Sequence, residues 1–180
     1  MSPALDWLGA QTQALHPLLR ELHARGGKLR GKVRLEYGKG LAGFIGRRLA
    51  AHLGVRATAG EHEFEVRIHH APDGLHWDRR FGDGPWLHSL FVPVGTWPDG
   101  YFIERIGAAR MHLTVDVTDG AWHWRLLAMR WLGLPLPRLI RLAAWKRIEQ
   151  GRYLFHAGFG LAGLGTLFFY QGLLDAEPDA

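Results

Sequence analysis

Two charged residues interrupt stretches of the sequence in which every second residue is apolar. Arg79 alternates with aromatic residues in LHWDRRF, and Glu104 alternates with apolar residues in YFIERIG. Because a buried unpaired charge is strongly destabilising, an inward-facing Arg and Glu should pair with each other or meet a ligand. A guanidinium can also hold an anionic group through two parallel hydrogen bonds. The pattern leaves two interpretations: a buried ion pair that fixes strand register, or an anchor for the polar group of a ligand.

Large aromatic side chains accompany this charged pair. The chain contains 8 Trp among 180 residues, and 12% of its residues are aromatic. Such side chains provide large apolar contact areas in ligand pockets, although in a small barrel they can also fill the interior completely. We therefore expect a ligand-binding cavity, with a filled core as the alternative. The candidate ligand-binding residues are Arg79, Glu104, Trp77, Trp122, Trp124 and Phe155.

The 11 histidines raise the question of a metal or catalytic site. His69 and His76 should face each other across a hairpin, but on its charged outer face and without a clear third ligand, so we predict no metal. Asp116 opposite His123 could orient a general base, yet Ser89 cannot be placed beside the pair. We predict no cofactor, name no catalytic residue and favour a non-enzymatic domain.

The elements that position these residues can be read from hydrophobic periodicity. Residues 4–24 have helical spacing interrupted by Pro17, and residues 29–37 alternate as a half-buried strand. Helical spacing returns at 41–53, where Leu41 and Phe44 belong to the apolar face of a second amphipathic helix. We expect a single domain over 1–180, with a helical N-terminal segment at 4–24 and a β-rich body at 29–174.

A series of hairpins follows, and their turns fix testable registers. The turn APDG places Ile68 opposite Trp77, the turn DG places Val115 opposite Trp124, and QG places Ile148 opposite Tyr153. About nine or ten antiparallel strands result, and a meander of this length tends to curl on itself. The predicted fold is α+β but mainly β: a strongly curved antiparallel meander, a barrel or half-barrel, packed against two amphipathic helices near the N-terminus.

Composition and charge exclude several other classes of protein. The absence of Cys excludes a disulfide scaffold, and neither a secretory signal nor an apolar run of membrane-spanning length is visible, so we expect a cytoplasmic protein. The net charge is +5, densest at Arg25–Lys39, but no nucleic-acid-binding motif accompanies it. A peripheral membrane contact is a further alternative, through this basic strand or the apolar loop at 132–138.

Several strings occur in an order that resembles one bacterial family. They are LEYGKGLAGFIGRRLAAHLG, HWDRRFG, FIERIGAARMHLTVDV, WLGLPLPRLI, and WKRIEQGRYLFHAGF followed by FFYQGLL. Their succession, from about Arg25 to Leu174, resembles the domain of unknown function DUF4166. Some members of that family are fused behind a domain similar to saccharopine dehydrogenase, so the resemblance implies a separately encoded oxidoreductase as a candidate partner and supplies no reaction.

These observations lead to three functional hypotheses. The first is a domain that binds a small hydrophobic or amphipathic molecule inside the curved sheet. The second is an enzyme, or an accessory subunit of an NAD(P)-dependent oxidoreductase, that acts in the same cavity. The third is a peripheral membrane protein.

Overall fold

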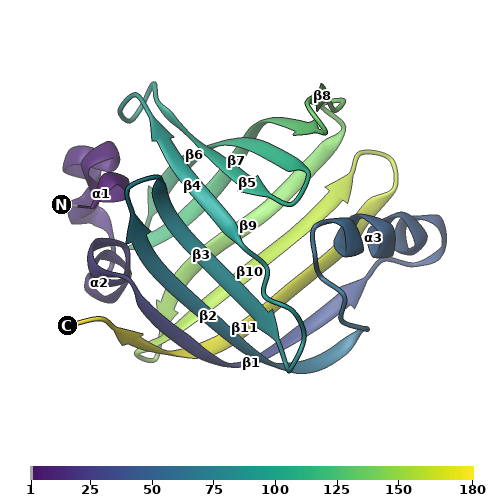
Figure 1. Ribbon diagram of the computed structural model, residues 1–180, viewed down its shortest axis with the longest axis horizontal. Coiled ribbons are helices and arrows are strands. Elements are labelled where there is room, and N and C mark those ends of the chain that lie inside the picture. The colour runs from purple at the N-terminus through teal and green to yellow at the C-terminus, as the bar shows by residue number, and fades with distance from the viewer. Residues whose placement is uncertain (1) are drawn as a thin grey trace.

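Alternating apolar residues and short turns produce one continuous antiparallel sheet. The computed structural model of the protein describes residues 2–180, and within them eleven strands belong to a single sheet (Figure 1). The strands are β1 (Gly27–Tyr37), β2 (Gly60–Ala71), β3 (Gly74–Phe81), β4 (Ser89–Val94), β5 (Tyr101–Ile106), β6 (Ala109–Thr118), β7 (Ala121–Trp131), β8 (Leu134–Pro135), β9 (Ile140–Glu149), β10 (Arg152–Leu161) and β11 (Gly165–Pro178).

The sheet closes into a barrel because β6, at one end of the strand order, pairs with β7, near the other end. The strand order is β6-β5-β4-β3-β2-β1-β11-β10-β9-β7-β8, and β6 also pairs with β7 along the whole hairpin. Ten strands therefore form a closed antiparallel barrel, and the two-residue strand β8 is attached to β7. The predicted class of a mainly β, curved antiparallel barrel is confirmed.

The registers predicted from the turns are also confirmed. Ile68 pairs with Trp77, Val115 with Trp124, and Ile148 with Tyr153. A bulge between His112 and Leu113 shifts the β6–β7 register farther from its turn, which increases local twist. The short turns set these registers. The apolar pattern supports them, because a slip of one residue would move every apolar side chain of a strand to the solvent face.

Three short N-terminal elements lie at the end of the barrel that also contains both termini (Figure 1). They are helix α1 (Pro3–Leu8), the 3₁₀ helix η1 (Gly9–Ala14) and helix α2 (Pro17–Arg25). Pro17 is the first residue of α2, a position where its missing N–H costs nothing, and the His16 side chain accepts a hydrogen bond from the Leu18 N–H at 3.2 Å. The buried face of α2 contains Leu19, Leu22 and His23.

Helix α3 (Gly40–His52) lies at the opposite end of the barrel, where it contacts β11 (Figure 1). The predicted apolar face is confirmed at Leu53, which is buried, and at Ile45 and Leu49, which pack against the core, but it is wrong at Leu41, which is 61% exposed, and at Phe44, which is 50% exposed. The helix buries small residues instead. A Cβ at Gly46 would lie 2.0 Å from the Leu167 carbonyl oxygen, so only glycine permits this close approach to β11.

The basic outer face of β1 is balanced by acidic neighbours. Lys32 Nζ lies 2.9 Å from Glu61, and Arg34 Nε lies 2.6 Å from Glu36. Arg30 reaches Glu177 at 3.6 Å. These pairs lie on the surface and neutralise most of the densest basic stretch. No helix within residues 2–180 is both long and apolar enough to span a lipid bilayer.

Candidate functional site

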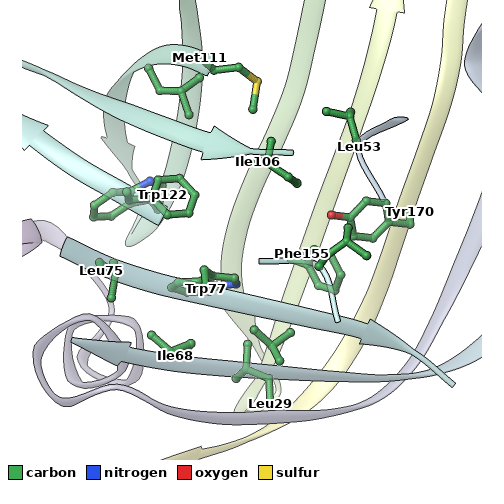
Figure 2. Close-up of a cluster of buried hydrophobic side chains, with 14 of the residues drawn as sticks. Leu29, Leu53, Ile68, Leu75, Trp77, Ile106, Met111, Trp122, Phe155 and Tyr170 are labelled. Carbon is green, nitrogen blue, oxygen red and sulfur yellow. The ribbon is translucent and has the colours of Figure 1, made fainter. Parts of the chain in front are cut away.

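The inward faces of the strands surround a cavity of about 110 Å³ in the barrel interior. Figure 2 shows Trp77, Trp122 and Phe155 inside the ring of strands, each from a different strand. The cavity is mostly apolar, with contributions from nearly every strand and from α2. All six residues predicted for the ligand site line it: Trp77, Arg79, Glu104, Trp122, Trp124 and Phe155.

Arg79 and Glu104 meet in the cavity wall. Arg79 Nη2 donates to Glu104 Oε1 at 3.1 Å and to Ser89 Oγ at 2.5 Å, while its Nη1 donates to the Tyr170 hydroxyl at 2.8 Å. The predicted pairing of the two charges is confirmed. Burial opposes the charged guanidinium, but Tyr170 and Glu104 raise the pKa of Arg79 above its ordinary value. Arg79 Nε is buried and has no hydrogen-bond acceptor among the described residues.

A second polar pair, which sequence reasoning missed, joins β9 to α2. Lys146 Nζ lies 2.6 Å from His23 Nε2, and both side chains are buried. The ring centroids of Trp77, Trp122 and Trp124 lie 4.1, 4.8 and 5.7 Å from the same nitrogen. Lys146 is thus enclosed by three indole rings and one imidazole.

The hydrogen bonds of His23 define its tautomer. Nδ1 lies 2.7 Å from the Leu19 carbonyl oxygen, which can only accept, so Nδ1 carries the proton. Nε2 is then the acceptor for an N–H of Lys146. Burial lowers the pKa of both His23 and Lys146 well below their ordinary values, and Arg79 adds to the effect on Lys146. Burial therefore favours the neutral imidazole and the neutral amine.

The sequence contained a signal for Lys146. The register that places Ile148 opposite Tyr153 extends along the hairpin to place Lys146 opposite Phe155, on the inward face. Lys146 therefore interrupts an apolar alternation in the same way as Arg79 and Glu104 do. His23 carried a weaker signal, one helical turn after Leu19 on the apolar face of α2.

The barrel wall beside Lys146 is weakly paired. Within the described chain, β7 and β9 pair at three positions: Trp122 with Lys146, His123 with Trp145, and Trp124 with Ala144. Toward the end of the barrel that carries α3, the two strands separate, and the cavity-lining residue Leu142 is half-buried.

The outer histidines do not form a metal site. The rings of His69 and His76 stack with centroids 4.7 Å apart, and His76 Nε2 lies 2.8 Å from Asp73. Among residues 2–180, no group of three or more His, Cys, Asp or Glu side chains is arranged to hold a metal ion. Asp116 forms an ion pair with Arg125 at 3.1 Å on the barrel exterior. Ser89 lies inside the barrel against Arg79, apart from Asp116.

The protein is a closed antiparallel β-barrel, and its interior combines apolar walls with two buried polar pairs. The family described as Domain of unknown function (DUF4166) matches residues 15–174, so the chain belongs to this family. Comparison with curated proteins finds no match to the chain.

Proposed function

We propose that the protein binds a compact hydrophobic or amphipathic molecule inside the barrel. The observation that supports this function is a cavity with apolar walls into which a few polar groups converge, which is the usual composition of a small-molecule site. An apolar cavity of about 150 Å³ in another protein is sufficient for benzene. The cavity here is somewhat smaller, at about 110 Å³, so it suits a ligand no larger than about one aromatic ring or a short branched chain.

Unpartnered donors indicate that the ligand carries a polar oxygen. Trp122 Nε1 and Arg79 Nε are buried and have no acceptor among the described residues. Each buried donor without a partner costs about 1–3 kcal/mol. A carbonyl or hydroxyl oxygen in the cavity would satisfy one of them, and an apolar remainder would contact the rings of Trp77 and Phe155.

Titration with benzyl alcohol and with toluene tests this function. Saturable binding should change tryptophan fluorescence, because indole rings line the cavity, and should raise the midpoint of thermal unfolding. Ala144 lines the cavity, so Ala144→Leu should fill it and weaken binding at least roughly tenfold, a loss of about 1.4 kcal/mol. Ala143→Leu is the matched control, since Ala143 is the exposed neighbour on β9.

Two results would overturn the proposal. One is the absence of saturable binding of either compound to the folded wild-type protein. The other is equal weakening by Ala144→Leu and Ala143→Leu, which would place the bound molecules outside the barrel.

A specific surface favours a peripheral membrane contact as a second function. Exposed leucines cluster in the turns at the end of the barrel where α3 lies (Figure 1). Leu132 and Leu134 flank the β7–β8 turn, and Leu139 and Leu164 lie in adjacent loops joined by a hydrogen bond of 2.9 Å from Ala162 N to the Leu139 carbonyl. The sequence from 120 to 148 contains basic residues and no Asp or Glu. Exposed apolar side chains beside basic ones suit an anionic lipid surface.

Sedimentation with phosphatidylserine-containing vesicles tests this contact. Leu132→Ser combined with Leu134→Ser should abolish sedimentation, whereas Leu127→Ser, an exposed leucine on the barrel side, should not. Failure of the wild-type protein to sediment with such vesicles at low salt would contradict the membrane contact.

A further inference from the structure

We propose that Lys146 binds an aldehyde or ketone ligand covalently, as an imine, inside the barrel. This inference rests on the proposed function, because the carbonyl compound must occupy the same cavity. It adds the chemical class of the ligand and the atom that holds it.

The surroundings of Lys146 are those of a nucleophile rather than of a structural cation. Its side chain lines the cavity, is only 6% exposed and forms no ion pair with a carboxylate among residues 2–180. Glu104 is committed to Arg79, and His23 offers Nζ a lone pair at 2.6 Å. A buried ammonium with three N–H donors would leave donors without acceptors, whereas a neutral amine needs fewer partners and has a free electron pair.

Three polar or charged groups face Lys146 from other elements. They are His23 on α2, Arg79 on β3 and Glu104 on β5. Burial lowers the pKa of Lys146 well below that of an ordinary lysine, with a further contribution from the positive charge of Arg79 that exceeds the opposing effect of Glu104. An ordinary lysine at pH 7 has only about 0.04% of its amines neutral. Lys146 is therefore the lysine of the described residues that is best prepared to attack a carbonyl.

The proposed reaction is balanced without any further reagent. The Nζ electron pair attacks the carbonyl carbon, and the carbon–oxygen π bond opens. Nζ then loses its two protons one at a time to the adjacent His23 Nε2, which passes each of them to the former carbonyl oxygen. The carbonyl oxygen leaves as water as the carbon–nitrogen double bond forms. The unpartnered Trp122 Nε1–H belongs to a ring whose centroid is 4.8 Å from Nζ.

The aromatic enclosure fits the product as well as the free amine. An imine that takes up a proton is a cation, and cations are stabilised over the faces of indole rings. Trp77 lies 4.1 Å from Nζ by its ring centroid, within the range of such an interaction. The ligand that this geometry selects is a compact carbonyl compound with one apolar substituent, for which benzaldehyde is a suitable probe.

Reductive trapping tests the proposal directly. The folded wild-type protein is incubated at pH 7 with benzaldehyde and sodium cyanoborohydride, and the mass and position of the adduct are determined by peptide mapping. Among the lysine side chains, we expect one benzyl group, on Lys146; labelling of the α-amino group, with an ordinary pKa of about 7.7–8.0, is mapped separately. The exposed amines of Lys28, Lys32 and Lys39 should react at least roughly tenfold more slowly, since ordinary lysines are almost fully protonated at pH 7. Lys146→Met should lose the adduct while keeping the far-ultraviolet circular dichroism of the wild type.

The outcomes separate this inference from the proposed function. If benzyl alcohol binds in the cavity but benzaldehyde labels only the surface lysines, covalent capture is wrong and non-covalent binding stands. If no compound binds in the cavity, the proposed function itself fails. Because peptide mapping of the wild-type chain locates the adduct, the result does not depend on the folding of Lys146→Met.

Discussion

Replacing Lys146 by methionine should stabilise the protein at neutral pH. Burial lowers the pKa of Lys146 in the folded protein and so favours the neutral amine, whereas the unfolded chain holds it as an ammonium. The unfolded state therefore binds one more proton than the folded state, and stability rises with pH up to the ordinary lysine pKa of about 10.4. At pH 7 the cost of removing that proton is about 4–5 kcal/mol, at about 1.4 kcal/mol per pH unit.

Methionine removes this cost but also removes one hydrogen bond. His23 Nε2 loses its donor at 2.6 Å, which leaves a buried acceptor unpaired at a cost of about 1–3 kcal/mol. The unbranched methionine side chain replaces most of the apolar contact with the three indole rings. The net expectation is a gain of about 2–3 kcal/mol in the free energy of unfolding at pH 7, from the difference of these two terms.

Urea denaturation of both proteins at pH 7, 8, 9 and 10 measures this difference. The advantage of Lys146→Met should shrink by about 1.4 kcal/mol per pH unit and should reverse between about pH 8.4 and 9.1. Lys28→Met is the control, since Lys28 is exposed on β1, and its effect should stay within about 0.5 kcal/mol at every pH. A Lys146→Met protein that is less stable than the wild type at pH 7, by an amount independent of pH, would refute the neutral amine.

Two further predictions concern the other buried polar groups. Arg79→Met should lower the free energy of unfolding by about 3–5 kcal/mol, because it leaves the Glu104 carboxylate buried without its partner. Adding Glu104→Gln should recover part of this loss in urea denaturation. Additive losses from the two substitutions would contradict a coupled pair. Burial lowers the pKa of His23, so the unfolded state binds more protons below about pH 6.5 and stability should fall as the pH decreases. His23→Leu should flatten this slope, and an unchanged slope would show that other groups cause it.

The hairpins could be predicted from the sequence because each is a local structure. The turns at APDG, DG and QG fix which residues face each other, and apolar pairs such as Ile68 with Trp77 verify the register. The same local logic identified Arg79 and Glu104 as inward-facing charges. Closure of the barrel could not be read in this way, because β1 and β11 come from opposite ends of the chain and no turn sets their pairing.

Two features of the site and its surroundings depended on tertiary contacts. Lys146 lies on β9, whose inward face becomes clear only when the β9–β10 register is extended from its turn. Its partner His23 is 123 residues away in the chain, and no spacing rule joins them. Helix α3 packs its small residues against β11, where the backbone comes too close for a side chain at Gly46. Leu41 and Phe44 are therefore exposed, although hydrophobic periodicity placed them on the apolar face.

A crystal structure of the protein soaked with bromobenzene is the most direct test of ligand binding inside the barrel. The anomalous scattering of bromine locates the compound even where its electron density is weak. If small apolar molecules bind in the cavity, a bromine site should be present inside the barrel, among Trp77, Trp122 and Phe155. In Ala144→Leu crystals treated identically, this site should be lost. Bromine found only on the outer surface of the barrel at saturating concentration, with the interior filled by side chains, would contradict a ligand-binding cavity in the barrel.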